Sequence, residues 1–216
     1  MLIVFDLDDT LIDTSGTITP FKMQCMVRML TEQGIHLGEN PYEEAKALNE
    51  RCKTSKEMVH QLLERYSALH LLGETLALYT SPLPTDFSIP TTPDAKKVLN
   101  SLNREIFTLA LVTGGVRSFQ LEKMEKAGLE HSNFSKIVVP EDSKKGPHYE
   151  DLLKEFSITN PQEALVVGDR IWMDLAPAHA LGMRTVHMRW GRGLKEQEEE
   201  WIDHSITSLN GLLKLL

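Results

Sequence analysis

The chain has 216 residues, of which 41% are hydrophobic and 25% are charged, and its formal net charge is -8 at pH 7. This length is enough for one sizeable core, or for a core domain with a smaller second domain. The acidic balance argues against nonspecific binding to nucleic acid or to acidic membranes. A phosphorylated substrate stays compatible with it, because a bound cation can reverse the local charge.

Features of targeting and redox chemistry point to a cytoplasmic protein. The apolar runs are shorter than the roughly 20 residues of a membrane span, and the chain enters its first expected strand without a basic leader. Cys25 and Cys52 are the two cysteines. Their spacing fits neither a zinc site nor a disulfide framework, so we expect reduced thiols.

The N-terminal third begins with a strand and continues as helices. Leu2–Asp6 is a short, continuous apolar run, which predicts a buried strand, and Thr14–Thr19 is rich in Ser, Thr and Gly, which indicates a hinge. Helical periodicity then runs from Pro20 to Gly34. Further helices are expected from about Pro41 and from Thr54, where Thr54 can cap the helix while Glu57 reaches back.

The rest of the chain alternates between strands and helices. Ser81–Pro93 contains four prolines and is expected to be a linker. Alternating strands and helices predict an α/β fold with a doubly wound parallel sheet covered on both faces. We therefore expect a core domain at 1–13 plus 89–216 and an inserted all-helical cap at 14–88. The expected helices are Pro93–Leu102, Val116–Ala127, Pro147–Phe156 and Ile171–Leu181, and the expected strands are Phe107–Val112, Lys136–Val139, Ala164–Gly168 and Arg184–Met188.

Two carboxylates follow the first strand directly. Asp6 and Asp8 are two residues apart, so both can project from the tip of the strand as it turns into a loop. Burying a carboxylate is costly unless it is paired or binds a metal. This pair therefore indicates a cation site or an acid/base site.

Three further polar clusters occur at strand ends or helix starts. They are Thr113-Gly114-Gly115, Gly168-Asp169 with Asp174, and Lys144-Lys145-Gly146-Pro147. In an open parallel sheet, ligands bind beyond the carboxyl ends of the strands. We therefore expect these clusters to meet the first one at a single site.

Other interpretations of these residues are open at this point. Asp169 and Asp174 can be a helix cap and a surface acid, and Thr113 can be a turn residue. A calcium loop starting at Asp6 is disfavoured, because leucine and threonine stand where glycine and glutamate are needed. The Trp190-Gly-Arg-Gly segment can face the substrate, but a plain surface loop is the favoured interpretation.

Taken together, the four clusters resemble the motifs of the haloacid dehalogenase-like superfamily. Asp6-Leu7-Asp8-Asp9-Thr10 is similar to motif one, Val112-Thr113-Gly114 to motif two, Lys144 to motif three, and Gly168-Asp169 with Asp174 to motif four. The helical insertion is similar to that of the helical-cap phosphatases, which include phosphoglycolate phosphatases. Dehalogenases of the superfamily lack an acid at the position of Asp8, so the resemblance favours phosphoryl transfer.

The resemblance implies Mg²⁺ as cofactor, held by Asp6, the backbone carbonyl of Asp8, and Asp169. Asp6 is then the nucleophile that forms an aspartyl-phosphate, and Asp8 the general acid and base, with a pKa that its surroundings should raise. Asp174 is expected to orient the motif-three lysine and a water at the metal rather than be a main ligand, although it is kept among the candidate ligands.

The same resemblance implies how the phosphoryl group is held. Thr113 and the N–H of Gly114 should bind the phosphoryl oxygens together with a lysine. The family often places that lysine three residues before a helix-starting proline, which favours Lys144 before Pro147. Lys145 stays open as a shift of register.

The expected activity is the Mg²⁺-dependent hydrolysis of a small phosphorylated metabolite, with neither nucleic acid nor membrane as partner. A phosphomutase of the same superfamily and a catalytically inert binding module stay open as alternatives. The individual substrate and the oligomeric state are not fixed by the sequence.

Overall fold

The computed structural model describes residues 1–142 and 144–216, which divide into two compact units. Unit 1 consists of Met1–Ser15 and Thr85–Leu216, and unit 2 is Gly16–Pro84. The chain thus leaves unit 1 shortly after its first strand and returns to it through a proline-containing segment.

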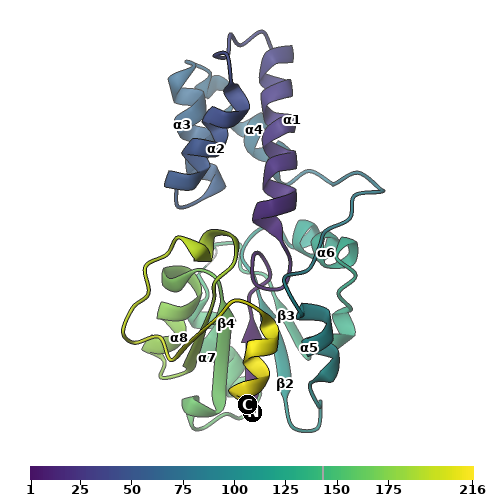
Figure 1. The fold of residues 1–216 in the computed structure, drawn as a ribbon, viewed down its shortest axis with the longest axis vertical. Coiled ribbons are helices and arrows are strands. Elements are labelled where there is room, and N and C mark those ends of the chain that lie inside the picture. The colour runs from purple at the N-terminus through teal and green to yellow at the C-terminus, as the bar shows by residue number, and fades with distance from the viewer. Residues whose placement is uncertain (143) are drawn as a thin grey trace. The chain divides into compact units, whose positions relative to one another are not determined.

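Unit 1 is built on a parallel sheet, which has six strands within the described residues (Figure 1). The strand order is β3-β2-β1-β4-β5-β6, so β1 lies between β2 and β4 and the order reverses there. The carboxyl ends of these three central strands are therefore adjacent at the switch point of the sheet, where open α/β folds bind ligands. The strands are β1 Leu2–Phe5, β2 Thr108–Val112, β3 Lys136–Val138, β4 Ala164–Gly168, β5 Arg184–Met188 and β6 His204–Ile206.

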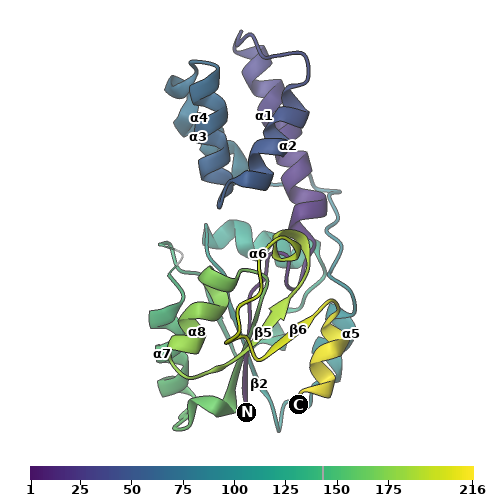
Figure 2. The same ribbon diagram turned by 60° about the vertical axis from the view of Figure 1, so that its left-hand side comes forward.

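Helices cover both faces of this sheet. Figure 2 shows α7 and α8 on one side of the strands and α5, with the C-terminal helical turns, on the other. Such double coverage explains why β1 and β4 are buried at every position rather than at alternate ones. The helices are α5 Ala95–Ser101, α6 Arg117–Lys126, α7 Gly146–Glu155 and α8 Ala176–Ala180.

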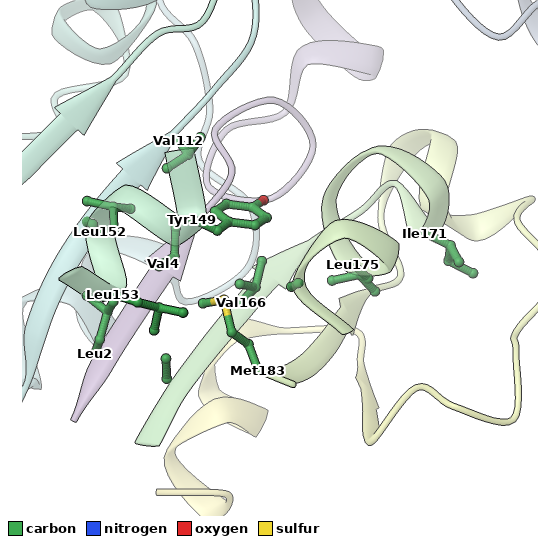
Figure 3. Packing of buried hydrophobic residues seen from close by; sticks show 13 residues of the cluster. Leu2, Val4, Val112, Tyr149, Leu152, Leu153, Val166, Ile171, Leu175 and Met183 are labelled. Atoms are coloured by element: carbon green, nitrogen blue, oxygen red, sulfur yellow. The ribbon is translucent and has the colours of Figure 1, made fainter. Parts of the chain in front are cut away.

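One face of the sheet packs against α7 and α8 in a continuous hydrophobic cluster (Figure 3). Val4 of β1 and Val166 of β4 are fully buried there, and Tyr149 and Leu152 of α7 are 1% exposed. Burial of such a side chain contributes about 1.5–3 kcal/mol. The cluster fixes β1 and β4, and hence the residues that follow each of them.

Two elements of unit 1 differ from the expectations. The helix expected at Ile171–Leu181 is a π-helical turn at Ile171–Leu175 followed by α8, which has a proline in its first turn. Proline lacks an N–H and fits only at the start of an α-helix, so the regular helix begins there. The edge strand β6 was not expected, because its three residues include no apolar run.

The elements of unit 2 are all helices within its described residues, and the α-helices are α1 Thr19–Glu32, α2 Pro41–Arg51, α3 Ser55–Arg65 and α4 Leu72–Tyr79. Its core joins the apolar faces of these helices, including Met26 of α1 and Leu62 of α3. Thr54 caps α3 by accepting the Glu57 N–H at 3.1 Å, as expected. The Glu57 carboxylate accepts the N–H of Lys53 rather than that of Thr54.

Lys22 of α1 is buried in unit 2, where its Nζ donates to the Leu78 carbonyl at 3.0 Å and to the Ser81 carbonyl at 2.6 Å. These bonds tie the end of α4 to the start of α1. In the part of the chain that the structure describes, no helix has the length and apolarity needed to cross a membrane.

Candidate active site

Asp6 lies at the carboxyl end of β1, and its backbone continues the sheet by donating to the Val167 carbonyl at 2.9 Å. The chain then turns sharply. The N–H groups of Leu11 and Ile12 both bond the Leu7 carbonyl, and Asp9 has a φ of +56°. This tight loop keeps the side chains of Asp6 and Asp8 near the strand tip.

Lys145 contacts Asp6, and this corrects the preferred assignment of Lys144. The Lys145 Nζ lies 2.5 Å from Asp6 Oδ1 and 2.6 Å from Asp174 Oδ1, and Lys145 is 4% exposed. Lys144 is exposed, and its backbone N–H bonds Asp142. Because α7 already begins at Gly146, the residue that turns into the sheet edge is one position later than the proline rule predicts.

Asp169 and Asp174 come from the end of β4 and the turn that follows it. Asp174 Oδ2 accepts the Arg170 N–H at 3.0 Å, which bends the segment back over the strand. A Cβ on Gly168 would lie 2.5 Å from the Asp174 Cβ, so the close approach requires glycine there. The backbone carbonyl of Asp169 is 3.1 Å from the buried His187 ring.

Carboxylate oxygens of Asp6, Asp169 and Asp174 lie within 4.8 Å of one another, and each residue is buried. Burial raises the pKa of Asp6 to about 7, with Lys145 opposing and Asp174 and Asp8 adding to the rise. Burial likewise raises the pKa of Asp169, as do Asp174 and Asp6. A divalent cation would offset this repulsion, and an all-oxygen set suits Mg²⁺. These residues therefore fit the expected metal.

Thr113 and Gly114 follow β2, next to β1. The Thr113 N–H bonds the Val138 carbonyl at 3.1 Å, and the residue is 1% exposed. Gly115 adopts a φ of +128°, which only glycine tolerates readily, and this lets the chain turn away from the sheet edge. Thr113 and Gly114 thus end up at the same edge as Asp6.

The surroundings of Asp8 lower its pKa, whereas the sequence led us to expect a raised one. Burial alone would raise the pKa of Asp8, but the Lys123 ammonium and hydrogen bonds from Thr14, Lys123 and Gln120 outweigh it. The expectation was wrong because it came from the need for a protonated general acid and not from the residues around Asp8. The structure instead places a cation from α6 directly on the carboxylate.

Gln120 and Lys123 are the site residues that sequence reasoning missed. They are 2% and 6% exposed although both are polar. Their signal was available in the helical periodicity: Phe119, Gln120, Lys123 and Met124 form one face of α6, and polar residues on a face that packs inward indicate a function.

The Trp190-Gly-Arg-Gly segment packs on the loop after β1 instead of lying free on the surface. Trp190 Nε1 donates to Asp13 Oδ1 at 3.1 Å. A Cβ on Gly191 would lie 2.3 Å from the Asp9 Cγ, and one on Gly193 would lie 2.7 Å from the Asp169 carbonyl oxygen. The favoured interpretation as a plain surface loop is therefore incomplete. The segment packs against both the loop after β1, at Asp9, and the loop after β4, at Asp169.

The chain is similar to known families and proteins. The family model described as haloacid dehalogenase-like hydrolase matches residues 3–188. A glyceraldehyde 3-phosphate phosphatase from Pyrococcus furiosus is 30% identical and is matched over 100% of this chain and 92% of its own length. A phosphoserine phosphatase from Thermus thermophilus is 34% identical over 51% of this chain and 45% of its own length.

Solved structures show the same fold. A predicted phosphoglycolate phosphatase from Haemophilus somnus superimposes with a TM-score of 0.74 at 17% identity, over 99% of this chain and 96% of that one. A HAD-hydrolase from Bacillus subtilis, solved bound to magnesium, gives a TM-score of 0.70 at 20% identity, over 100% of this chain and 97% of that one.

Proposed function

We propose, from the premise that the chain belongs to the haloacid dehalogenase-like hydrolases, that it is a Mg²⁺-dependent phosphatase acting on a small phosphorylated metabolite through an aspartyl-phosphate. One observation carries the proposal. Buried Asp6 is in contact with Lys145 and within 4.8 Å of two further carboxylates at the switch point of the sheet. Such a cluster is costly to maintain for stability alone.

The metal would be held by the carboxylates of Asp6 and Asp169 and by the backbone carbonyl of Asp8. Asp174, whose oxygens already bond Lys145 and the Arg170 N–H, would orient the lysine rather than serve as a main ligand. When bound, Mg²⁺ supplies the positive charge that offsets repulsion between the anionic ester and the anionic nucleophile.

The first step forms a covalent intermediate. A carboxylate oxygen of Asp6 attacks phosphorus, the bond from phosphorus to the ester oxygen breaks, and the proton of Asp8 goes to that departing oxygen. Lys145 stabilises charge on Asp6 and on the phosphoryl group, while the Thr113 hydroxyl and the Gly114 N–H hold phosphoryl oxygens.

The second step regenerates the enzyme. Water attacks the phosphorus of the aspartyl-phosphate, Asp8 accepts its proton, and the bond from phosphorus to Asp6 breaks to release inorganic phosphate. Asp8 must be protonated when the next substrate binds. The negative charge of the approaching ester counteracts the effect of the Lys123 ammonium and raises the pKa of Asp8, which favours the protonated form.

Unit 2 is proposed to act as the cap that excludes water from the site during attack. The chain enters and leaves unit 2 at Ser15/Gly16 and Pro84/Thr85, which are proposed as the hinges. The Asp9 carboxylate accepts both the N–H of Ser15 at 2.8 Å and its hydroxyl at 2.5 Å. The entry to unit 2 is thereby fastened to the loop that holds Asp6 and Asp8.

The substrate class is tested with a panel of phosphorylated metabolites and Mg²⁺, with released phosphate as the readout. Glyceraldehyde 3-phosphate, phosphoserine and phosphoglycolate come first, because the names of relatives or fold neighbours include them. Release from at least one small ester supports the proposal. Interconversion of sugar phosphates without release would instead show a phosphomutase, and no reaction across the panel would show an inert binding module.

A further inference from the structure

We infer that Lys123 and Gln120 of α6 are positioning residues that hold the carboxyl group of Asp8 in the orientation for proton transfer to the leaving group. The inference rests on the proposed phosphatase function, because it concerns the same site. It adds to the four family-like motifs a pair of side chains that lies outside all of them.

Lys123 contacts both oxygens of Asp8. Its Nζ lies 2.9 Å from Asp8 Oδ1 and 3.0 Å from Asp8 Oδ2, and its side chain is 8% exposed. The ammonium also lies 4.9 Å from the ring centroid of Phe119, one turn earlier on the helix. A buried ammonium that meets both oxygens restricts rotation of the carboxyl group about its last bond.

Gln120 connects Asp8 to the phosphate-binding turn. Its Nε2 lies 3.1 Å from Asp8 Oδ2, 2.9 Å from Thr113 Oγ1 and 2.6 Å from the Gly114 carbonyl oxygen. An amide NH₂ has two hydrogens to share among these acceptors. One side chain therefore fixes the proton donor relative to the residues that would hold the phosphoryl group.

Residues from two different segments hold the carboxyl group of Asp8. The hydroxyl of Thr14 bonds Asp8 Oδ1 from the loop after β1, while Lys123 and Gln120 approach from α6. The Asp8 side chain is 30% exposed, so part of it still faces a substrate or water. A general acid must lie within about 2.6–3.2 Å of its proton acceptor, so a carboxyl free to rotate would lose efficiency.

The test compares substrates that differ in how much they need a proton on the leaving oxygen. The substitution Lys123→Met is assayed with p-nitrophenyl phosphate and with an alkyl phosphate turned over by the wild type, both with Mg²⁺. Nitrophenolate is a stable anion and leaves with little protonation, whereas an alkoxide is strongly basic and needs a proton in order to leave. We expect kcat to fall about 100-fold for the alkyl ester and less than about 5-fold for p-nitrophenyl phosphate, with KM nearly unchanged.

Three further variants make the result specific. Asp8→Asn should show the same substrate dependence, and adding Lys123→Met to it should cause little further loss, because both changes remove one function. Lys123→Arg should recover part of the alkyl-ester activity, since a guanidinium can also meet both oxygens. Lys154→Met is the matched control, as its exposed ammonium pairs with Glu150 on its own helix.

The possible outcomes distinguish a failure of this inference from a failure of the phosphatase proposal. Equal losses on both substrates, or a double variant whose loss is the product of the two single losses, would overturn the inference while leaving the phosphatase proposal intact. A wild-type protein that releases phosphate neither from p-nitrophenyl phosphate nor from any ester of the metabolite panel would overturn both. If Lys123→Met does not fold, Gln120→Met carries the same comparison, and a uniform loss in that variant overturns the inference equally.

Discussion

The Nζ of Lys145 lies 2.5 Å from Oδ1 of Asp6, although 139 positions separate the two residues in the chain. The contact brings the start of α7 to the tip of β1, and Oδ1 of Asp174 lies 2.6 Å from the same Nζ. Burial of Lys145 lowers its pKa, but Asp174 and Asp6 outweigh this and raise the pKa well above its usual value. The lysine is thus a permanent cation beside the proposed nucleophile.

Replacing Lys145 should affect both turnover and stability. Lys145→Met leaves two buried carboxylates without their cation, so we expect a loss of turnover of at least about 100-fold and a decrease of about 3–5 kcal/mol in the free energy of unfolding. Steady-state kinetics and urea unfolding measure these quantities. Lys144→Met, which changes the exposed neighbour, is the matched control and should leave both nearly unchanged; equal small losses in the two variants would contradict the assignment.

The role of Asp6 as nucleophile is tested by Asp6→Asn. The amide keeps the shape of the side chain but cannot form the phosphoryl ester, so turnover should fall by at least about 1,000-fold. Circular dichroism and the melting temperature check that the fold persists. Substantial residual turnover in a folded variant would falsify the aspartyl-phosphate route.

Much of the fold follows from sequence patterns that are local. The strands after residue 107 are short apolar runs flanked by turn residues, and β4 and β5 have the bounds that the pattern predicts. The doubly wound sheet follows from alternation of these strands with helices. The edge strand β6 was not predicted from the sequence, because an edge strand of three residues, two of them exposed, needs no apolar run.

The site was less predictable where it depends on long-range contacts. Asp6, Asp169 and Asp174 meet as expected, because all of them follow neighbouring strands. The register at Lys145 and the inward face of α6 with Gln120 and Lys123 depend on how each helix packs. Sequence spacing defines a helix but not its rotation to within one residue. The choice between the neighbouring lysines therefore stayed open, and the contacts of Lys123 and Gln120 with Asp8 were not predicted.

Binding of Mg²⁺ should depend on pH through Asp6. The folded-state pKa of Asp6 is about 7 against an ordinary 3.8, so the folded protein binds more protons than the unfolded chain between these values. Without divalent cations, the free energy of unfolding should therefore decrease as pH rises across that window. Mg²⁺ binds the ionised carboxylates and should raise the melting temperature more at about pH 8 than at about pH 5.

Differential scanning fluorimetry with and without Mg²⁺ measures this directly. Asp6→Asn removes the titrating group, so its melting temperature should depend less on pH, and its stabilisation by Mg²⁺ should shrink. A magnesium effect that is equal at both pH values, or larger under acid conditions, would contradict the proposed ligand set.

The Trp190-Gly-Arg-Gly segment offers a prediction about a residue that needs no contact with substrate. Gly191 has a φ of +50°, and a Cβ there would lie 2.3 Å from the Asp9 Cγ, so Gly191→Ala must displace the side chain of Asp9, the neighbour of Asp8 in the loop after β1. Gly182→Ala is the matched control: its φ is +77°, but the nearest atom to its Cβ is 3.7 Å away.

Both variants should lose about 1 kcal/mol of stability from backbone strain, measured by urea unfolding. Only Gly191→Ala should also lose turnover, by about 10-fold or more, because displacement of a positioning loop misaligns the reacting groups. Equal kinetics in the two variants would show that the contact between Gly191 and Asp9 does not position the site.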